Sequence, residues 1–212
     1  MLSFGLLLIA SYLLGSIPTS YLLGRWLKGI DIRDHGSGNV GSTNAYRTLG
    51  ARPAIFTVVA DILKGFIPVF FFTFYWKGWG QEIDIPYVWV QISFGICAII
   101  GHIRTIFLKF RGGKGVATGA GVILGLTPIP ALIALTLFIA LVAGTGYVSL
   151  GSIVAALSIP IVLVAGKFSV APQIEWELIS LGVVLAITVL VTHRSNIGRF
   201  LRKEEKRIWN KT

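Results

Sequence analysis

The sequence predicts an all-α integral membrane protein of about seven transmembrane helices, with its N-terminus outside and its C-terminus in the cytoplasm. Three observations support this fold class. Of the 212 residues, 54% are hydrophobic and only 13% are charged, and the mean hydropathy is +0.78. One water-soluble core cannot hide so much apolar surface. In addition, long apolar segments recur along the chain, and basic residues gather between alternate segments.

The apolar segments have lengths suited to helices in a bilayer, where about 20 residues span the hydrocarbon. The fourth segment is too short to cross alone, and Pro128 and Pro130 separate it from the fifth, so we expect a half-helix or a tilted hairpin there. The first segment follows no basic residue and precedes no small-residue cleavage site, so it is interpreted as an uncleaved span. The segments lie at about residues 3–24, 54–76, 86–101, 116–126, 129–144, 147–166 and 177–192.

The distribution of Lys and Arg predicts the orientation. Residues 25–52 hold five of these side chains, residues 102–115 hold four and the tail from residue 193 holds seven, which is 16 of the 19 in the chain. Positive charge collects on the cytoplasmic side of membrane proteins. We therefore expect all three basic segments to face the cytoplasm, and seven crossings satisfy the parity of the two ends. The chain is expected to form a single domain over 1–212.

Several classes of function are disfavoured by composition. The formal net charge of +10 would suggest nucleic acid on a soluble protein, but here the basic residues lie between membrane segments, so an anionic lipid or substrate fits better and no nucleic-acid partner is expected. Cys97 is the single cysteine, which excludes a disulfide framework. His35, His102 and His193 lack carboxylates or thiols at ligand spacing, so no metal and no cofactor is expected.

The basic segments also carry the unusual local patterns. Residues 35–44 read HGSGNVGSTN and are followed by Arg47, so glycines that permit tight turns stand beside short polar side chains that can wrap an anion. Residues 101–118 begin with Gly-His and place Lys114 in a glycine run that opens the next apolar segment. Backbone N–H groups at a helix start, together with a lysine, favour phosphate binding.

A third pattern, Thr192-His-Arg-Ser-Asn196, ends the last apolar segment, and a weaker one, Tyr147-Val-Ser149, starts the sixth. Inside the second segment, Asp61 and Lys64 lie one helical turn apart, where unpaired charge is expensive, so we expect them to neutralise each other or to reach the site. The basic residues of 199–211 are interpreted almost entirely as topology signals.

Two familiar nucleotide-binding motifs do not apply. Gly36, Gly38 and Gly41 fit the dinucleotide fingerprint, but they follow a charged loop rather than a strand. Lys114 is followed by Gly rather than Ser or Thr, so it is not the lysine of a P-loop. The capacity of such glycine loops to cradle phosphate does not depend on either motif.

The three ordered patterns resemble the motifs of the bacterial acyl-phosphate:glycerol-3-phosphate acyltransferases, the PlsY family. The resemblance rests on residues 37–44, 101–118 and 193–196, and the length, the expected topology, Asp61-x-x-Lys64-Gly and Tyr147-Val-Ser149 are also similar. It implies transfer of a fatty acyl group from acyl phosphate to the sn-1 hydroxyl of glycerol 3-phosphate. The products would be lysophosphatidic acid and inorganic phosphate, in the first step of phospholipid biosynthesis.

The resemblance also implies a set of site residues, a location and partners. We expect a multi-pass protein of the bacterial cytoplasmic (inner) membrane, a monomer surrounded by membrane lipid, with its active site facing the cytoplasm. Phosphate binding is implied for Ser37, Arg47, Lys114, Ser149, His193 and Asn196. The expected catalytic residues are His193, Lys114, Arg47 and Asn196, and the expected substrate-binding residues are Ser37, Asn39, Thr43, Asn44, His102, Gly112, Gly113 and Ser149.

This chain departs from the family pattern at two places. Arg104-Thr105 stands where the family usually has Phe-Pro, and Thr192 precedes His193 where Arg is common. The third motif is therefore less basic than usual, and Arg104 is a candidate to compensate.

The residue types also favour a direct mechanism. Both substrates carry phosphate, so two anion cradles are needed, and glycine loops with Lys and Arg supply them. No Ser-His-Asp order, G-x-S-x-G elbow or His-x4-Asp pair is present. We expect attack by the substrate hydroxyl itself, with basic residues and backbone donors stabilising the oxyanion. The proton acceptor is left open between His193 and the phosphate of the acyl phosphate.

Two other functional classes stay open at this point. The short fourth segment and the Gly and Pro interruptions are compatible with a small transporter of an anionic solute, although no internal repeat is visible. A scaffold that binds acidic lipid would explain the basic tail but not the three polar motifs.

Overall fold

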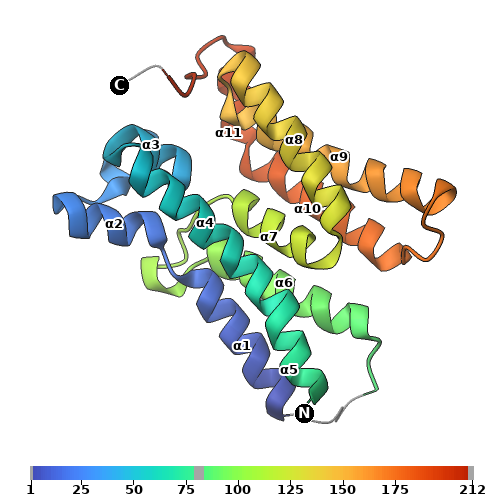
Figure 1. Cartoon of the computed structure of the whole chain (residues 1–212). Helices are drawn as coiled ribbons and strands as arrows, with labels where there is room; N and C mark the ends of the chain where they lie inside the picture. Colours follow the sequence, from blue (N-terminus) through green and yellow to red (C-terminus); the bar gives the residue numbers. More distant parts are fainter. Residues whose placement is uncertain (1, 79–83, 210–212) are drawn as a thin grey trace. The chain divides into compact units, whose positions relative to one another are not determined.

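The computed structural model describes residues 2–78 and 84–209, and it divides the chain into two compact units, one up to Leu126 and one from Thr127. Every regular element in the described residues is helical (Figure 1). The all-α prediction is therefore confirmed.

The first unit contains helices α1 to α7 and three short irregular helices. Apolar helices α1 and α6 pack along each other, and α4 packs along α7 (Figure 1). The elements are α1 (Leu2–Ser16), α2 (Thr19–Lys28), the 3-10 turn η1 (Ile32–Asp34), α3 (Ser42–Leu49), α4 (Ala51–Ile67), the π-helical turn η2 (Pro68–Phe72), α5 (Thr73–Gly78), α6 (Tyr87–Ile103), the 3-10 turn η3 (Ile106–Leu108) and α7 (Val116–Leu126).

Glycines allow the helices of this unit to approach closely. A Cβ atom at Gly15 would clash with the carbonyl oxygen of Ala98 on α6, and one at Gly65 would clash with the carbonyl oxygen of Thr118 on α7. Backbone-to-backbone packing of this kind is common between membrane helices. Small residues let the helices approach, and van der Waals packing then drives their association in place of the hydrophobic effect. The close contact of α4 with α7 places Lys114, at the entrance to α7, on a rigid support.

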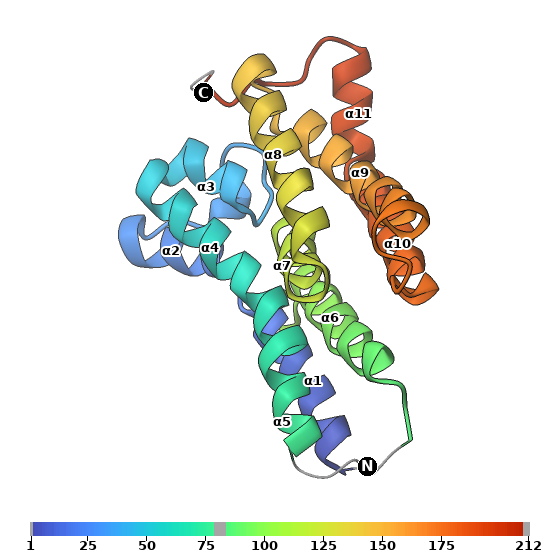
Figure 2. The same ribbon diagram turned by 45° about the vertical axis from the view of Figure 1, so that its right-hand side comes forward.

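The second unit consists of α8 (Pro128–Thr145), α9 (Val148–Ser169), α10 (Trp176–Thr192) and α11 (Arg194–Leu201). Helix α9 packs against both α8 and α10 (Figure 2). The chain beyond α11 returns to the loop between α8 and α9, where the amide of Ile208 donates to the carbonyl of Gly146 at 2.8 Å. The tail therefore packs on the start of α9.

The helices follow the predicted apolar segments closely, with one difference at each end of the chain. Residues 3–24 were expected to form one helix, but the chain breaks at Ile17-Pro18 and α2 bends from α1 by 43°. Proline lacks the N–H that would continue the hydrogen-bond ladder, which explains the break. Near the other end, α11 bends from α10 by 58°.

Among the described residues, four helices are long and apolar enough to cross a membrane, or six if each bent pair counts as one span. Helix α7 is a shorter apolar helix, as the sequence predicted for the fourth segment. The count of seven crossings and the orientation of the ends stay predictions.

Candidate active site

The glycine-rich loop of the first unit is held by one buried amide. Asn44, which is 1% exposed at the start of α3, accepts a hydrogen bond from the backbone N–H of Ser37 at 2.8 Å. Its Nδ2 donates to the carbonyls of Ile32 at 2.9 Å and His35 at 3.1 Å. Asn44 therefore shapes the loop from inside, while Ser37 itself is exposed.

The loop turns through left-handed backbone at two of its glycines. Gly36 and Gly38 have φ angles of 61° and 68°, which L-residues with a side chain rarely adopt. A Cβ at Gly36 would also clash with Oδ1 of Asn44. The other predicted residues here, Asn39, Thr43 and Arg47, are half-buried on the loop and on α3.

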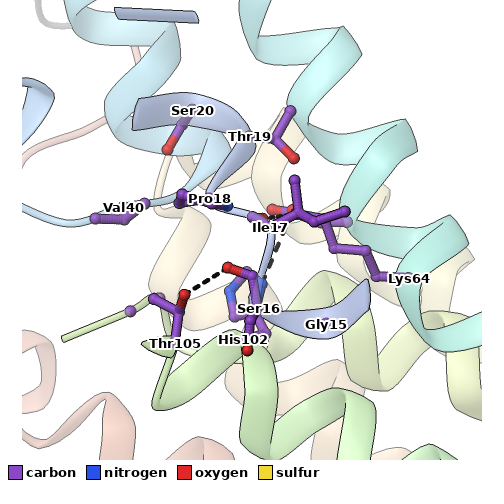
Figure 3. Close-up of a pocket in the computed structure, with 13 residues that line it drawn as sticks. Gly15, Ser16, Ile17, Pro18, Thr19, Ser20, Val40, Lys64, His102 and Thr105 are labelled. Atoms are coloured by element: carbon purple, nitrogen blue, oxygen red, sulfur yellow. Dashed lines mark hydrogen bonds and ion pairs between the residues drawn. The ribbon is translucent and has the colours of Figure 1, made fainter. Parts of the chain in front are cut away.

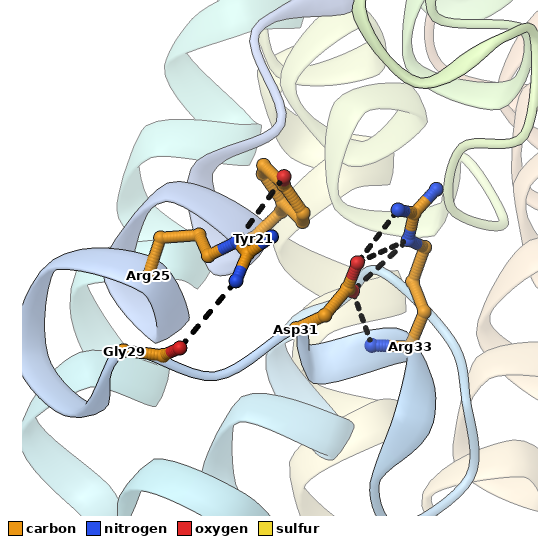
Figure 4. Close-up of polar contacts among 5 residues, drawn as sticks. All are labelled: Tyr21, Arg25, Gly29, Asp31 and Arg33. Atoms are coloured by element: carbon orange, nitrogen blue, oxygen red, sulfur yellow. Dashed lines mark hydrogen bonds and ion pairs between the residues drawn. The ribbon is translucent and has the colours of Figure 1, made fainter.

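An ion pair stabilises the entrance to this loop (Figure 4). Asp31 accepts from the backbone N–H and the guanidinium of Arg33, with 2.6 Å between Oδ2 and Nη2. Hydrogen bonding from Arg33 lowers the pKa of Asp31 from 3.8 to about 2. The Arg33 guanidinium also lies over the ring of Tyr21, 5.3 Å from its centroid. The turn η1 is thus tied to α2 before the glycines begin.

The second glycine run folds back on the end of α6. The amides of Gly112 and Gly113 donate to the carbonyls of Ile103 and His102, each at 3.0 Å. Lys114 is half-buried directly after them, and Gly115 has a φ angle of 81° before α7 begins. Lys114 therefore lies just before the N-terminus of α7, directly after backbone that is hydrogen-bonded to α6. This arrangement is expected for an anion site.

Thr105, one of the departures from the family pattern, has a structural role. Its side chain is buried, and Oγ1 donates to the carbonyl of Ser16 at 2.5 Å and accepts from the N–H of Phe107 at 3.2 Å. The neighbouring carbonyl of Arg104 accepts from the hydroxyl of Tyr12 at 2.8 Å. The contacts with Ser16 and Tyr12 join this loop to α1.

The two glycine loops meet within the first unit. A Cβ at Gly113 would lie only 2.6 Å from the carbonyl oxygen of Val40 and would clash with Nε2 of His102. A small pocket at this junction is shown in Figure 3. Its lining comes from the break between α1 and α2, from α4, from the end of α6 and from both loops, and includes Gly15 to Ser20, Val40, Asp61, Lys64, His102, Thr105, Gly112 and Gly113.

Asp61 and Lys64 form an ion pair inside α4. Their Oδ1 and Nζ atoms are 2.5 Å apart and both residues are 4% exposed, so the predicted mutual neutralisation is confirmed. Both side chains also line the pocket beside the glycine run. The alternative that they reach the substrate itself stays a prediction.

In the second unit, two predicted site residues meet on one carboxylate. Ser149 at the start of α9 donates to Oε1 of Glu205 at 2.8 Å, and Nδ2 of Asn196 on α11 donates to the same oxygen at 2.6 Å. Nε of Arg199 donates to the other oxygen at 2.8 Å. The side chain of Glu205 is only 7% exposed. The carboxylate therefore holds Ser149 and Asn196 next to each other.

Glu205 is the residue that sequence reasoning missed. Burial alone would raise its pKa, but hydrogen bonds from Asn196, Ser149 and Arg199 outweigh burial and hold that pKa below its usual value. Arg199, interpreted from the sequence as a topology signal, also pairs with this carboxylate. The sole sequence signal was an acidic pair, Glu204-Glu205, in an otherwise basic tail.

His193 lies buried between α10 and α11, at 3% exposure. Its Nδ1 is 2.9 Å from the carbonyl oxygen of Val189. A carbonyl only accepts, so this contact assigns the proton of a neutral ring to Nδ1 and leaves Nε2 as the acceptor. A neutral His193 ring in this contact has the tautomer that a proton-accepting histidine needs.

The sequence-predicted residues thus fall into two groups. The first unit brings together the loop of Ser37 to Asn44 and the run of Gly112 to Lys114. The second unit brings together Ser149 and Asn196, and His193 lies at the junction of α10 and α11. Neutral donors, glycine backbone and basic side chains can bind phosphate oxygens. Within residues 2–78 and 84–209, no three His, Cys, Asp or Glu side chains are grouped so that they could hold a metal ion.

Comparison with known proteins gives a consistent result. The family model described as glycerol-3-phosphate acyltransferase matches residues 5–203. A glycerol-3-phosphate acyltransferase of Geobacter sulfurreducens is 44% identical over 202 residues, which cover 95% of this chain and 96% of the relative. A relative of the same name from Geotalea daltonii is 46% identical, with 91% of each chain covered.

Two crystal structures of PlsY, an integral membrane glycerol 3-phosphate acyltransferase, have the same fold. The glycerol 3-phosphate form superposes with a TM-score of 0.82 at 35% identity, over 97% of this chain and 95% of that one. The lysophosphatidic acid form has a TM-score of 0.80 at 34% identity.

Proposed function

Because the chain belongs to the glycerol-3-phosphate acyltransferase family of integral membrane proteins, we propose that it transfers a fatty acyl group from acyl phosphate to the sn-1 hydroxyl of glycerol 3-phosphate. The products are 1-acyl-glycerol 3-phosphate, that is lysophosphatidic acid, and inorganic phosphate. One observation carries the proposal: the two similar crystal structures are the glycerol 3-phosphate form and the lysophosphatidic acid form of PlsY. These are an acyl acceptor and its acylated product.

The proposed reaction is a direct displacement. The sn-1 oxygen forms a bond to the acyl carbon, the bond from that carbon to the phosphate oxygen breaks, and inorganic phosphate leaves. Phosphate is a good leaving group, so no covalent acyl-enzyme is needed. The hydroxyl proton passes to Nε2 of His193, for which the Nδ1 contact with Val189 provides the tautomer, or to the departing phosphate.

Lys114 and Arg47 supply positive charge to the phosphates, and the glycine loops supply backbone donors. Ser37, Asn39, Thr43, Gly112 and Gly113 complete the cradle on the first unit, and Ser149 and Asn196 complete the one on the second. Asn44 and His102 act in this scheme by shaping the loops around the substrates, since their contacts are with loop backbone or buried side chains.

The first test measures phosphate release by detergent-purified protein given acyl phosphate and glycerol 3-phosphate. Release that needs both substrates supports the enzyme, and solute uptake into vesicles without chemistry would favour the transporter. Lys114→Ala should nearly abolish turnover in folded protein, because it removes a charge-assisted contact worth about 1.5–3 kcal/mol. Lys211→Ala in the tail is the matched control and should keep parental activity.

The second test concerns the mechanism. Radiolabelled acyl phosphate alone should leave no stoichiometric label on denatured protein, and initial-rate plots should intersect. Label that chases into product on adding glycerol 3-phosphate, together with parallel plots, would contradict direct attack. Ser37→Ala and Ser149→Ala would then identify the nucleophile.

The proposal also includes a location. Both units act as one domain of a monomer in the bacterial inner membrane, with the site facing the cytoplasm, as the 16 basic residues in three segments indicate. In a Cys97→Ala background, cysteines at the exposed positions Phe107 and Ser195 should react only from the cytoplasmic side. A cysteine at Val170, which is 85% exposed between α9 and α10, should react only from outside.

A further inference from the structure

The Asp61–Lys64 pair is an expensive feature of this fold. Both side chains are 4% exposed within a 28-residue apolar helical stretch that is long enough to span a membrane. Ionisable residues at such positions are rare, and a buried ion pair seldom adds net stability compared with apolar residues of the same size. The pair is therefore expected to have a role beyond mutual neutralisation, through its other contacts.

Lys64 contacts the break in the first predicted span. Its Nζ donates to the carbonyl oxygen of Ile17 at 2.6 Å, in addition to its contact with Asp61. That carbonyl also accepts from the backbone N–H of Thr19 at 3.0 Å, at the break that Pro18 makes between α1 and α2. The ammonium therefore supports the end of α1, where positive charge is favourable.

Asp61 faces the imidazole of His102 on α6. Its Oδ1 lies 3.8 Å from Nδ1 of the ring, which is too long for a hydrogen bond but close enough for an electrostatic interaction. The other ring nitrogen, Nε2, is packed so tightly against Gly113 that a Cβ there would clash. The ring of His102 thus lies between Asp61 and the glycine run.

The backbone of His102 reaches the same run. Its carbonyl oxygen accepts from the amide of Gly113 at 3.0 Å, and a Cβ at Gly112 would clash with that oxygen. Thr105, two residues beyond Ile103, bonds the carbonyl of Ser16, next to Ile17. The ion pair, the α1–α2 break and the glycine run are therefore joined around one pocket (Figure 3).

We propose that the Asp61–Lys64 pair is a positioning device for the glycine run, acting through His102 and through the α1–α2 break to fix where Lys114 presents its charge. This inference rests on the proposed role of Lys114 in binding substrate phosphate. Neither Asp61 nor Lys64 needs to touch a substrate in this role. Loss of the pair displaces Lys114 without removing its charge, so phosphate recognition should weaken more than the chemical step slows.

The test replaces both charges at once. Asp61→Leu/Lys64→Met removes the pair without leaving an unpaired buried charge, so the protein should still fold and elute as the parent does. Its KM for at least one phosphate-bearing substrate, and the inhibition constant of inorganic phosphate, should rise by about tenfold, the effect of losing one well-placed charged contact. The turnover number should change less than KM.

Thr57→Val is the matched control. Thr57 is buried on the same helix as Asp61, but its hydroxyl donates to the carbonyl of Pro53 within α4. It should leave both constants unchanged. If the double variant does not fold, His102→Gln decides, since it removes the imidazole between Asp61 and Gly113 while keeping the backbone contacts.

The outcomes are distinct. A folded double variant, or a folded His102→Gln variant, with parental KM and phosphate inhibition would overturn the positioning role. A parent that shows no transfer from acyl phosphate would instead overturn the proposed function. A fall in turnover alone, with KM and phosphate inhibition unchanged, also contradicts positioning of Lys114.

Discussion

Two buried carboxylates, Asp61 in α4 and Glu205 in the tail, are both bound by several groups but in opposite ways. Asp61 has its main partner, Lys64, three residues away on the same helix. The partners of Glu205 come from two helices: Ser149 on α9 at a sequence separation of 56, and Asn196 and Arg199 on α11 at separations of 9 and 6. A pair at helical spacing can be predicted from sequence, whereas a carboxylate that gathers distant donors cannot.

The two sites also differ in what removal would expose. Loss of Asp61 leaves the ammonium of Lys64 buried without its counter-ion. Loss of Glu205 leaves two neutral donors and Arg199, whose side chain is 38% exposed and can be solvated. We therefore expect the membrane-embedded pair to matter more for stability and the tail carboxylate to matter more for the geometry of Ser149 and Asn196.

The largest effect is expected for Asp61→Ala. Breaking a buried ion pair by removing one partner destabilises proteins by about 3–5 kcal/mol, because the remaining charge has no compensation. Thermal unfolding of detergent-purified protein would measure the loss. Lys64→Ala should behave similarly, and Asp61→Leu/Lys64→Met should recover most of the stability. A single variant as stable as the parent would remove the contrast with Glu205.

A smaller loss is expected for Glu205→Ala. Unsatisfied donors left at a buried site cost about 1–3 kcal/mol, and water can reach part of this one. Activity should fall further than stability, since Ser149 and Asn196 lose their common acceptor. Comparing the melting temperature and the turnover of Glu205→Ala with those of the neighbouring Glu204→Ala tests this. Equal activities of the two variants would show that the cluster does not organise the site.

The pH dependence sharpens the same contrast. The pKa of Glu205 is lowered in the folded protein, so its contribution is fully present above the ordinary value of 4.5 and is lost as the pH falls through the folded value. The difference in melting temperature between the parent and Glu205→Gln should therefore shrink below about pH 4.5. A difference that stays constant to lower pH would contradict the hydrogen-bonded carboxylate.

The smallest effect is expected for the partly exposed pair of Asp31 and Arg33. Asp31→Asn should cost at most about 1 kcal/mol, because solvent screens a pair in which Arg33 is 35% exposed. Since the pKa of Asp31 is lowered from 3.8 to about 2, its contribution is present above 3.8 and disappears as the pH falls towards 2. Melting temperatures of parent and variant across this range would measure it. A loss of stability as large as that of Asp61→Ala would contradict the expectation that burial determines the order of these effects.

The sequence by itself determined the all-α class, the approximate helix bounds and the Asp61–Lys64 pair. These features depend on local quantities, namely the length of apolar segments relative to a bilayer and the spacing of residues on one helix turn. It also indicated the glycine runs and Lys114 as a candidate anion site, because the backbone freedom of glycine and the positive charge of lysine are properties of the residue types themselves.

Only the tertiary structure decided which groups those residues meet. The break at Pro18 was not predicted from the sequence, and the contact of Lys64 with the Ile17 carbonyl required α4 to pack beside α1. Similarly, Glu205 became the acceptor of Ser149 and Asn196 because the tail returns to the start of α9. Hydrogen bonds form between atoms about 3 Å apart in space, and distance along the chain does not determine that separation.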